Sequence, residues 1–161
     1  MYTAQALIDT RADSVPSTGT STCFRERAKT KAAAYRCLVV DDDPIILRLV
    51  AEMLSELNFQ VDVAEDGQKA FSKISAHQFD LVVTDLEMPE MNGFLLASKT
   101  KRHSSGTKTV IMTGRCHAEV FSMMATAVVD AWLFKPFGLD ELCQTLGDLK
   151  LSNKLRPAVG S

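Results

Sequence analysis

The chain has 161 residues, of which 46% are apolar and 24% are charged, and its formal net charge is −2. These values are typical of one globular domain with tails, and they argue against nucleic-acid binding through bulk positive charge. There is no apolar segment of the kind found in secretory signals or membrane spans, so we expect a cytoplasmic protein. The four cysteines are scattered without a CxxC pair, which favours neither a zinc site nor a disulfide framework.

Residues 1–34 differ in composition from the rest of the chain. Residues 14–22 are rich in Ser, Thr, Pro and Gly, and residues 25–36 are basic and rich in alanine. We interpret residues 1–34 as a flexible N-terminal extension. The alternative for the basic segment is a docking arm for an acidic partner or a targeting peptide. Residues 35–150 form the predicted domain and residues 151–161 a short tail.

Within the domain, short apolar runs alternate with helix-period patterns. The pattern predicts strands at 37–40, 59–64, 81–85, 108–113 and 131–134, and helices at 45–57, around 70–74, and at 94–100, 118–127 and 139–149. Five strands that alternate with five helices favour an α/β fold with a parallel sheet, doubly wound and covered on both faces.

Polar side chains follow four of these strands. The first strand ends in Asp41-Asp42-Asp43, the third in Asp85, the fourth in Thr113, and the fifth is followed by Lys135. Taken singly, each is more often a cap, a strand end or a solvated charge than a functional group. Together they converge, because parallel strands direct their carboxyl ends to one edge of the sheet.

Crowded carboxylates repel, and two unit charges ~4 Å apart cost about 4 kcal/mol at an effective dielectric constant of 20. A cation relieves this, and oxygen ligands without His or Cys suit Mg²⁺ together with phosphate oxygens. Asp85 is then a plausible nucleophile toward a phosphoryl group, with Lys135 and Thr113 as donors to its oxygens.

The motifs taken together resemble the receiver domain of two-component response regulators. They are Asp41-Asp42 after Leu-Val-Val, Asp85 within DLxxxDLxMPxMxG, Thr113-Gly114 after Val-Ile-Met, and Lys135-Pro136-Phe137, and the resemblance covers about residues 36–149. It implies a flavodoxin-like (βα)5 fold with strand order 2-1-3-4-5, an order for which a member of this family is the standard example.

The resemblance also implies roles for individual residues. Asp85 would accept a phosphoryl group from a phosphohistidine of a sensor histidine kinase or a phosphotransfer protein. Mg²⁺ would be held by Asp41, Asp42, Asp85 and the backbone carbonyl of Glu87. Thr113 would be the switch hydroxyl, and Lys135 would pair with the phosphoryl group.

Three flanking residues are also expected to matter. Trp132 stands where the family usually has a switching Tyr or Phe, and a static anchor on the last strand is an equal alternative. Glu87 and Arg115 flank the site, and their opposite charges suggest a pair that slows loss of the phosphoryl group.

These observations lead to a stand-alone receiver that switches or relays a phosphoryl group and is not a turnover enzyme. Its partner would read the face formed by the fourth helix, fifth strand and fifth helix. The alternative is a magnesium-dependent phosphohydrolase that uses the Asp41-x-Asp43 spacing; a third, an interaction module without phosphorylation, conflicts with the intact acidic residues and Lys135.

Overall fold

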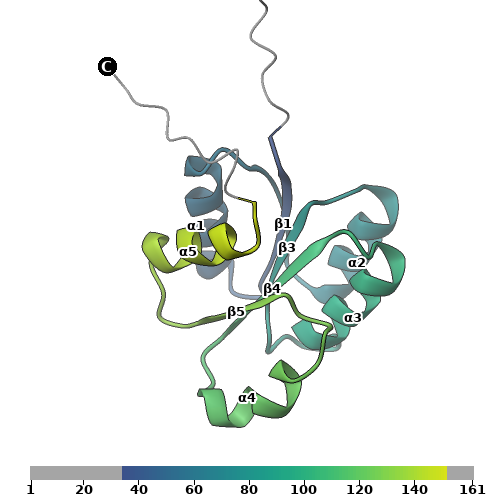
Figure 1. Cartoon of the computed structure of the whole chain (residues 1–161). Coiled ribbons are helices and arrows are strands. Elements are labelled where there is room, and N and C mark those ends of the chain that lie inside the picture. Colours follow the sequence, from purple (N-terminus) through teal and green to yellow (C-terminus); the bar gives the residue numbers. More distant parts are fainter. Residues whose placement is uncertain (1–33, 152–161) are drawn as a thin grey trace, which may run out of the picture. The chain divides into compact units, whose positions relative to one another are not determined.

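The computed structural model describes residues 34–151, so most of the predicted extension and tail lies outside the described residues. Strands and helices alternate throughout this part of the chain (Figure 1). The elements are β1 (Arg36–Val40), α1 (Pro44–Glu56), β2 (Gln60–Ala64), α2 (Gly67–Ala76), β3 (Leu81–Asp85), α3 (Gly93–His103), β4 (Lys108–Thr113), α4 (His117–Met124), β5 (Ala131–Phe134) and α5 (Leu139–Asp148).

The five strands form one sheet in the order β2-β1-β3-β4-β5, and every neighbouring pair is parallel. The predicted flavodoxin-like architecture is therefore confirmed. All five residues of β3, the central strand, are buried, whereas β2 and β5 at the two edges are partly exposed. A fully buried central strand explains why residues 81–83 form an uninterrupted apolar run in the sequence.

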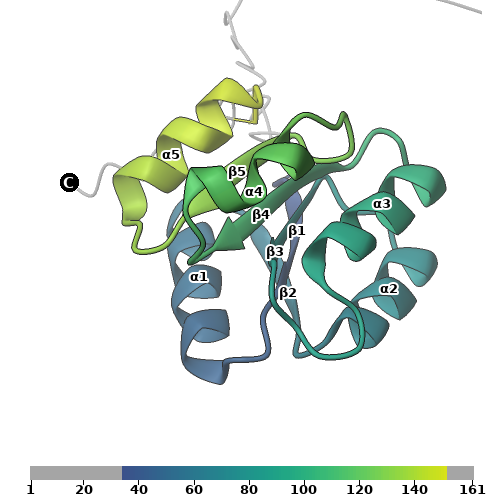
Figure 2. The same ribbon diagram turned by 90° about the horizontal axis from the view of Figure 1, so that it is seen from below.

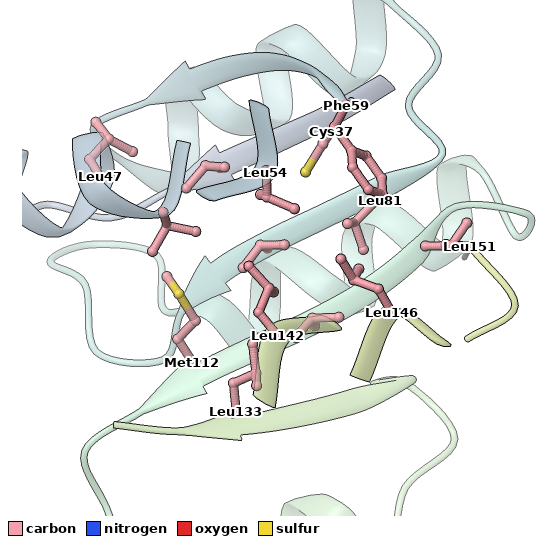
Figure 3. Close-up of a cluster of buried hydrophobic side chains, with 14 residues drawn as sticks. Cys37, Leu47, Leu54, Phe59, Leu81, Met112, Leu133, Leu142, Leu146 and Leu151 are labelled. Atoms are coloured by element: carbon pink, nitrogen blue, oxygen red, sulfur yellow. The ribbon is translucent and has the colours of Figure 1, made fainter. Parts of the chain in front are cut away.

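Helices cover both faces of the sheet, with α1 and α5 on one face and α2, α3 and α4 on the other (Figures 1 and 2). Side chains alternate along each strand to fill the two layers. In β1, Cys37 and Val39 join the cluster under α1 and α5, which Figure 3 shows, while Leu38 and Val40 join the cluster under α2 and α3.

Three helices begin at residues whose side chains cap the helix N-terminus. Asp43, Asp66 and Asn92 each accept a hydrogen bond from the backbone in the first turn of α1, α2 and α3, respectively, and so satisfy an N–H that has no partner within the helix. The end of α1 uses Asn58, whose φ of 62° is accessible to Asn at low cost and stops the helix before β2.

In α1, the apolar Leu49 is 46% exposed, and the stripe that faces the sheet contains Leu47, Val50 and Leu54. Because α1 carries apolar residues on more than one face, periodicity alone does not select the buried one. The fourth helix ends at Met124 and not at residue 127.

Leu151, the last described residue and the first residue of the predicted tail, belongs to the core. Leu151 is 6% exposed and packs in the cluster under α1 and α5, and its N–H donates to the carbonyl of Leu146. Between residues 34 and 151, no helix combines the length and apolar character needed to cross a membrane.

Candidate phosphoryl-acceptor site

The sheet register places the predicted site residues at one edge. Val40 pairs with Thr84, so Asp41 and Asp85 are the next residues on adjacent strands, and Thr113 pairs with Phe134 directly before Lys135. The carboxyl ends of β1, β3, β4 and β5 therefore deliver the acids, the hydroxyl and the ammonium group to the same region, as the sequence predicted.

Lys135 lies between the two buried carboxylates. Its Nζ is 2.6 Å from Oδ1 of Asp85 and 3.1 Å from Oδ2 of Asp41. Asp41 is 2% exposed and Asp85 is 7% exposed, so both ion pairs are largely shielded from water. The backbone N–H of Lys135 donates to the carbonyl of Thr113 at 2.7 Å, which fixes the start of the side chain beside β4.

Burial and pairing act in opposite directions on these groups. Burial raises the pKa of Asp41, and this outweighs the lowering by the Asp43 N–H and the Lys135 ammonium. Burial would lower the pKa of Lys135, but its hydrogen bond and charge interaction with Asp85, together with the Asp41 charge, raise it. Lys135 is thus held as a cation in the position where two carboxylates would otherwise repel.

Backbone amides hold the remaining carboxylate oxygens. The N–H of Asp43 donates to Oδ1 of Asp41 at 2.9 Å, and the N–H of Glu87 donates to Oδ2 of Asp85 at 2.6 Å. The loop after Asp85 then turns back on itself, with the N–H of Gly93 donating to the carbonyl of Leu86 at 3.0 Å. Both acids therefore have fixed orientations before any ligand binds.

Asp42 and Asp43 differ from Asp41 although they follow it directly. Both are exposed, and Oδ1 of Asp43 accepts the N–H of Ile45 at 2.8 Å as the cap of α1. Asp43 is thus committed to the helix and does not join Asp41 as a pair of catalytic acids. Asp42 lines an open groove together with Glu87, Asn92 and Arg115.

The hydroxyl of Thr113 is buried and its oxygen accepts the N–H of Arg115 at 3.0 Å. This bond uses the acceptor side of the hydroxyl and leaves its hydrogen available for donation. Arg115 in turn donates from Nε to Oε1 of Glu87 at 2.9 Å, so the predicted pair across the entrance is present. Both side chains are about half exposed.

The face of the sheet under α4 carries the aromatic residues near the site. Trp132 is half-buried in a cluster with residues of α3, α4 and β5. The imidazole of His117 stacks on Phe134 with ring centroids 3.7 Å apart. Sequence reasoning missed this contact because the two residues lie on different elements and no local pattern links them.

The carboxylates at this edge of the sheet are the predicted ligands of Mg²⁺. Within residues 34–151 no three His, Cys, Asp or Glu side chains are grouped as a preformed metal cluster, and Lys135 takes the place of a cation between Asp41 and Asp85. Mg²⁺ needs only one or two carboxylates, because water and phosphate oxygens complete its shell. The carboxylates of Asp41 and Asp85, with that of Asp42 at the adjoining groove, supply oxygen ligands of the kind that Mg²⁺ requires.

Comparisons with known proteins agree with the geometry. A 146-residue alignment with the sensor histidine kinase RcsC of Escherichia coli is 32% identical and covers 91% of this chain, but only 15% of RcsC. The transcriptional regulatory protein TcrA of Mycobacterium tuberculosis is 32% identical over 116 residues, which is 72% of this chain and 46% of TcrA. This chain therefore spans less than half the length of either relative.

Solved structures of similar size have the same fold. The response regulator TrrA of Thermotoga maritima, in complex with Mg²⁺-BeF, is 33% identical, with a TM-score of 0.65 over 71% of this chain and 98% of that one. A CheY-like receiver domain protein of Methanospirillum hungatei is 28% identical, with a TM-score of 0.68 over 76% of this chain and 97% of that one. The family model of the response regulator receiver domain matches residues 37–147 of this chain. The chain belongs to the family of response regulator receiver domains of two-component signalling.

Proposed function

We propose that Asp85 accepts a phosphoryl group from a phosphohistidine donor and that the protein signals through the resulting change. The observation that supports this most directly is the Asp41–Lys135–Asp85 arrangement, a buried carboxylate held between an ammonium and a backbone N–H. In the transfer, a carboxylate oxygen of Asp85 forms a bond to phosphorus while the bond from phosphorus to the histidine nitrogen breaks. The leaving imidazole keeps the bonding electrons and takes up a proton.

Two residues of the chain would interact with the phosphoryl group once it is attached. A phosphoryl group adds about −1.5 to −2 units of charge and three acceptor oxygens. Lys135 is already within hydrogen-bonding distance of Asp85, so its ammonium can shift to a phosphoryl oxygen. Thr113 can donate its free hydroxyl hydrogen, and movement toward the phosphoryl group would strain its bond to Arg115.

Asp41, Asp42, Asp85 and the carbonyl of Glu87 would hold Mg²⁺, as predicted from the sequence. When bound, the metal ion would neutralise charge on the phosphoryl group. The protein groups prepare for this by fixing Asp41 and Asp85 through the N–H groups of Asp43 and Glu87. The capping role of Asp43 gives no support to a hydrolase that uses Asp41 and Asp43 as a pair.

Output would pass through the face formed by α4, β5 and α5. Two large apolar side chains of α4 are exposed, Phe121 by 72% and Met124 by 37%, and a protein partner on this helix would cover them. Thr113 precedes α4 by a three-residue loop, so a shift of its hydroxyl has a direct route to this helix. The partner would be a downstream protein or a further phosphotransfer protein in a relay.

The test is mass spectrometry of the chain after incubation with Mg²⁺ and acetyl phosphate, with Asp85→Asn alongside. We expect one base-labile phosphoryl adduct in the wild type and none in Asp85→Asn or in excess chelator. The single tryptophan, Trp132, gives a second readout, because its emission should change with the adduct if the ring moves. Rapid phosphate release without an adduct, lost in Asp41→Asn, would instead establish a hydrolase.

A further inference from the structure

Helices α2 and α3 pack side by side on one face of the sheet (Figures 1 and 2). Their charge distribution is unusual. Together α2 and α3 carry five Lys or Arg residues and no Asp or Glu, whereas α5 carries three acids and no Lys or Arg. In a chain of net charge −2 this is a local concentration of positive charge. Basic residues near the end of α3 also complement its dipole, so position alone does not establish a binding role.

Ion pairing separates these cations into two groups. Lys69 pairs with Glu65 and Asp66, and Lys101 pairs with Asp130. Among the described residues, those Lys and Arg side chains that have no ion pair with another described residue are Arg48, Lys73, Lys99, Arg102 and Lys150. Three of these five lie on α2 and α3, so most of the positive charge on these two helices is not balanced by a neighbouring acid.

Two of these three cations, Lys99 and Arg102, line a hollow that also contains an aromatic ring. A hollow between the two helices is lined by Phe71, Lys99, Arg102 and His103. Nζ of Lys99 lies 5.1 Å from the centroid of the Phe71 ring, and the His103 imidazole meets that ring edge-on at 6.3 Å. The hollow thus offers an apolar floor with cationic walls, a combination that suits carboxylates next to an apolar side chain.

The hollow lies away from the phosphoryl-acceptor site. Gly93 at the start of α3 touches the backbone of Asp85, whereas Lys99 to His103 form the last turns of that helix. An 11-residue helix is about 16 Å long. A partner at the hollow would therefore approach the opposite end of the helix from Asp85 and would leave the α4-β5-α5 face free.

We propose that this hollow is a second docking surface, which binds an acidic protein segment containing an apolar side chain. A nucleic acid is the less suitable occupant, because stacking needs an accessible aromatic face and the Phe71 ring is already engaged by Lys99 and His103. The proposal is independent of phosphorylation at Asp85, since none of its residues belongs to that site.

The test uses the full 161-residue chain and a fluorescein-labelled peptide in which glutamates flank one central leucine. We expect an anisotropy increase that added salt reduces, and about a tenfold or greater loss of affinity in the double variant Lys99→Glu/Arg102→Glu. Arg48→Glu/Lys150→Glu is the matched control, because it changes the net charge equally at two other unpaired cations. Its affinity should be within about twofold of the wild type.

Several outcomes would overturn the proposal. These are the absence of binding, equal loss in both double variants, equal binding of a peptide with glutamine in place of glutamate, and tighter binding of an oligothymidylate that the same variant abolishes. Phosphorylation of Asp85 by acetyl phosphate should be unchanged in Lys99→Glu/Arg102→Glu. That control separates a failure of the docking surface from a failure of the phosphoryl-acceptor site.

Discussion

Asp85 and Gly93 lie at the two ends of the loop that joins β3 to α3, and their backbones are in contact. A Cβ atom built on Gly93 would stand 2.1 Å from the carbonyl oxygen of Asp85 and 3.0 Å from its carbonyl carbon. Neither atom is the flexible end of a side chain, so the backbone itself would have to move. The glycine is required here by space and not by its conformational freedom, because its φ is not positive.

We expect Gly93→Ala to lower the free energy of unfolding by about 1–3 kcal/mol, the usual cost of forcing atoms into a packed site. Helix propensity alone favours alanine by about 1 kcal/mol, so a loss of stability would come from the contact with Asp85. Urea denaturation measures the effect. Gly106→Ala is the matched control, because nothing lies within 4 Å of its Cβ position, and it should change stability by less than about 0.5 kcal/mol.

Glu87 and Arg115 form an ion pair at the entrance to the site. The pair is exposed, and the hydrogen bond to Glu87 raises the pKa of Arg115. Exposed pairs contribute little to stability. Their position across the groove beside Asp42 instead suggests control of water access to the site.

We predict that Glu87→Ala, Arg115→Ala and the double variant lose the phosphoryl group several-fold faster than the wild type, because water reaches phosphorus more easily. The decay can be followed by mass spectrometry after removal of acetyl phosphate. Lys69→Ala breaks a comparably exposed pair on α2 and should leave the decay rate unchanged. Equal decay rates in the wild type and the double variant would rule out a role for the pair.

Asp130 connects three elements at the edge of the sheet opposite the site. The Nζ atom of Lys101, on α3, lies 2.6 Å from Oδ2 of Asp130, and that of Lys108, on β4, lies 3.1 Å from Oδ1. The backbone N–H of Thr109 donates to Oδ2 of Asp130 at 2.8 Å. These contacts hold the segment that leads into β5. Burial would raise the pKa of Asp130, but the bonds from Lys101, Thr109 and Lys108 outweigh it and lower the pKa.

We expect Asp130→Asn to cost about 1.5–3 kcal/mol at pH 7, in the range for hydrogen bonds to a charged group. A carboxyl group whose pKa is lowered by folding contributes its full stabilisation above its unfolded pKa of about 3.9 and loses it as the pH falls through the folded value. The difference between wild type and variant should therefore shrink below about pH 4. Urea denaturation at several pH values tests this, and a constant difference would contradict it.

For the domain as a whole, the predicted magnesium site links ligand binding to folding. A ligand that binds only the folded state stabilises it by about 2.7 kcal/mol at a concentration 100 times its dissociation constant. Asp42 is exposed and makes no hydrogen bond within residues 34–151 like the one by which Asp43 caps α1, so its substitution should affect the metal ion and little else.

We predict that Mg²⁺ raises the Tm of the wild type and that Asp42→Asn reduces this rise while leaving the Tm without Mg²⁺ nearly unchanged. Asp43→Asn is the control of equal charge change. Asn caps a helix as well as Asp does, so this variant should keep both the basal Tm and the response to Mg²⁺. An unchanged response in Asp42→Asn would remove this residue from the predicted ligands.

Much of the fold could be predicted because its determinants are local. The alternation of short apolar runs with helix-period segments, the caps at Asp43, Asp66 and Asn92, and the uninterrupted run of β3 each depend on neighbouring residues. Parallel pairing then follows from the helical crossovers, and it brings Asp41, Asp85, Thr113 and Lys135 to one edge. The sequence alone therefore determined the architecture and the residues that meet at the site.

Only the tertiary structure decided which partners these residues have. The ammonium of Lys135 between Asp41 and Asp85 and the stacking of His117 on Phe134 join residues on different elements. The same is true of the choice of Leu47 over Leu49 for the core, and of the hollow around Phe71. Such contacts depend on the rotation and packing of each helix against the sheet, and the periodicity of one element does not specify how it meets another.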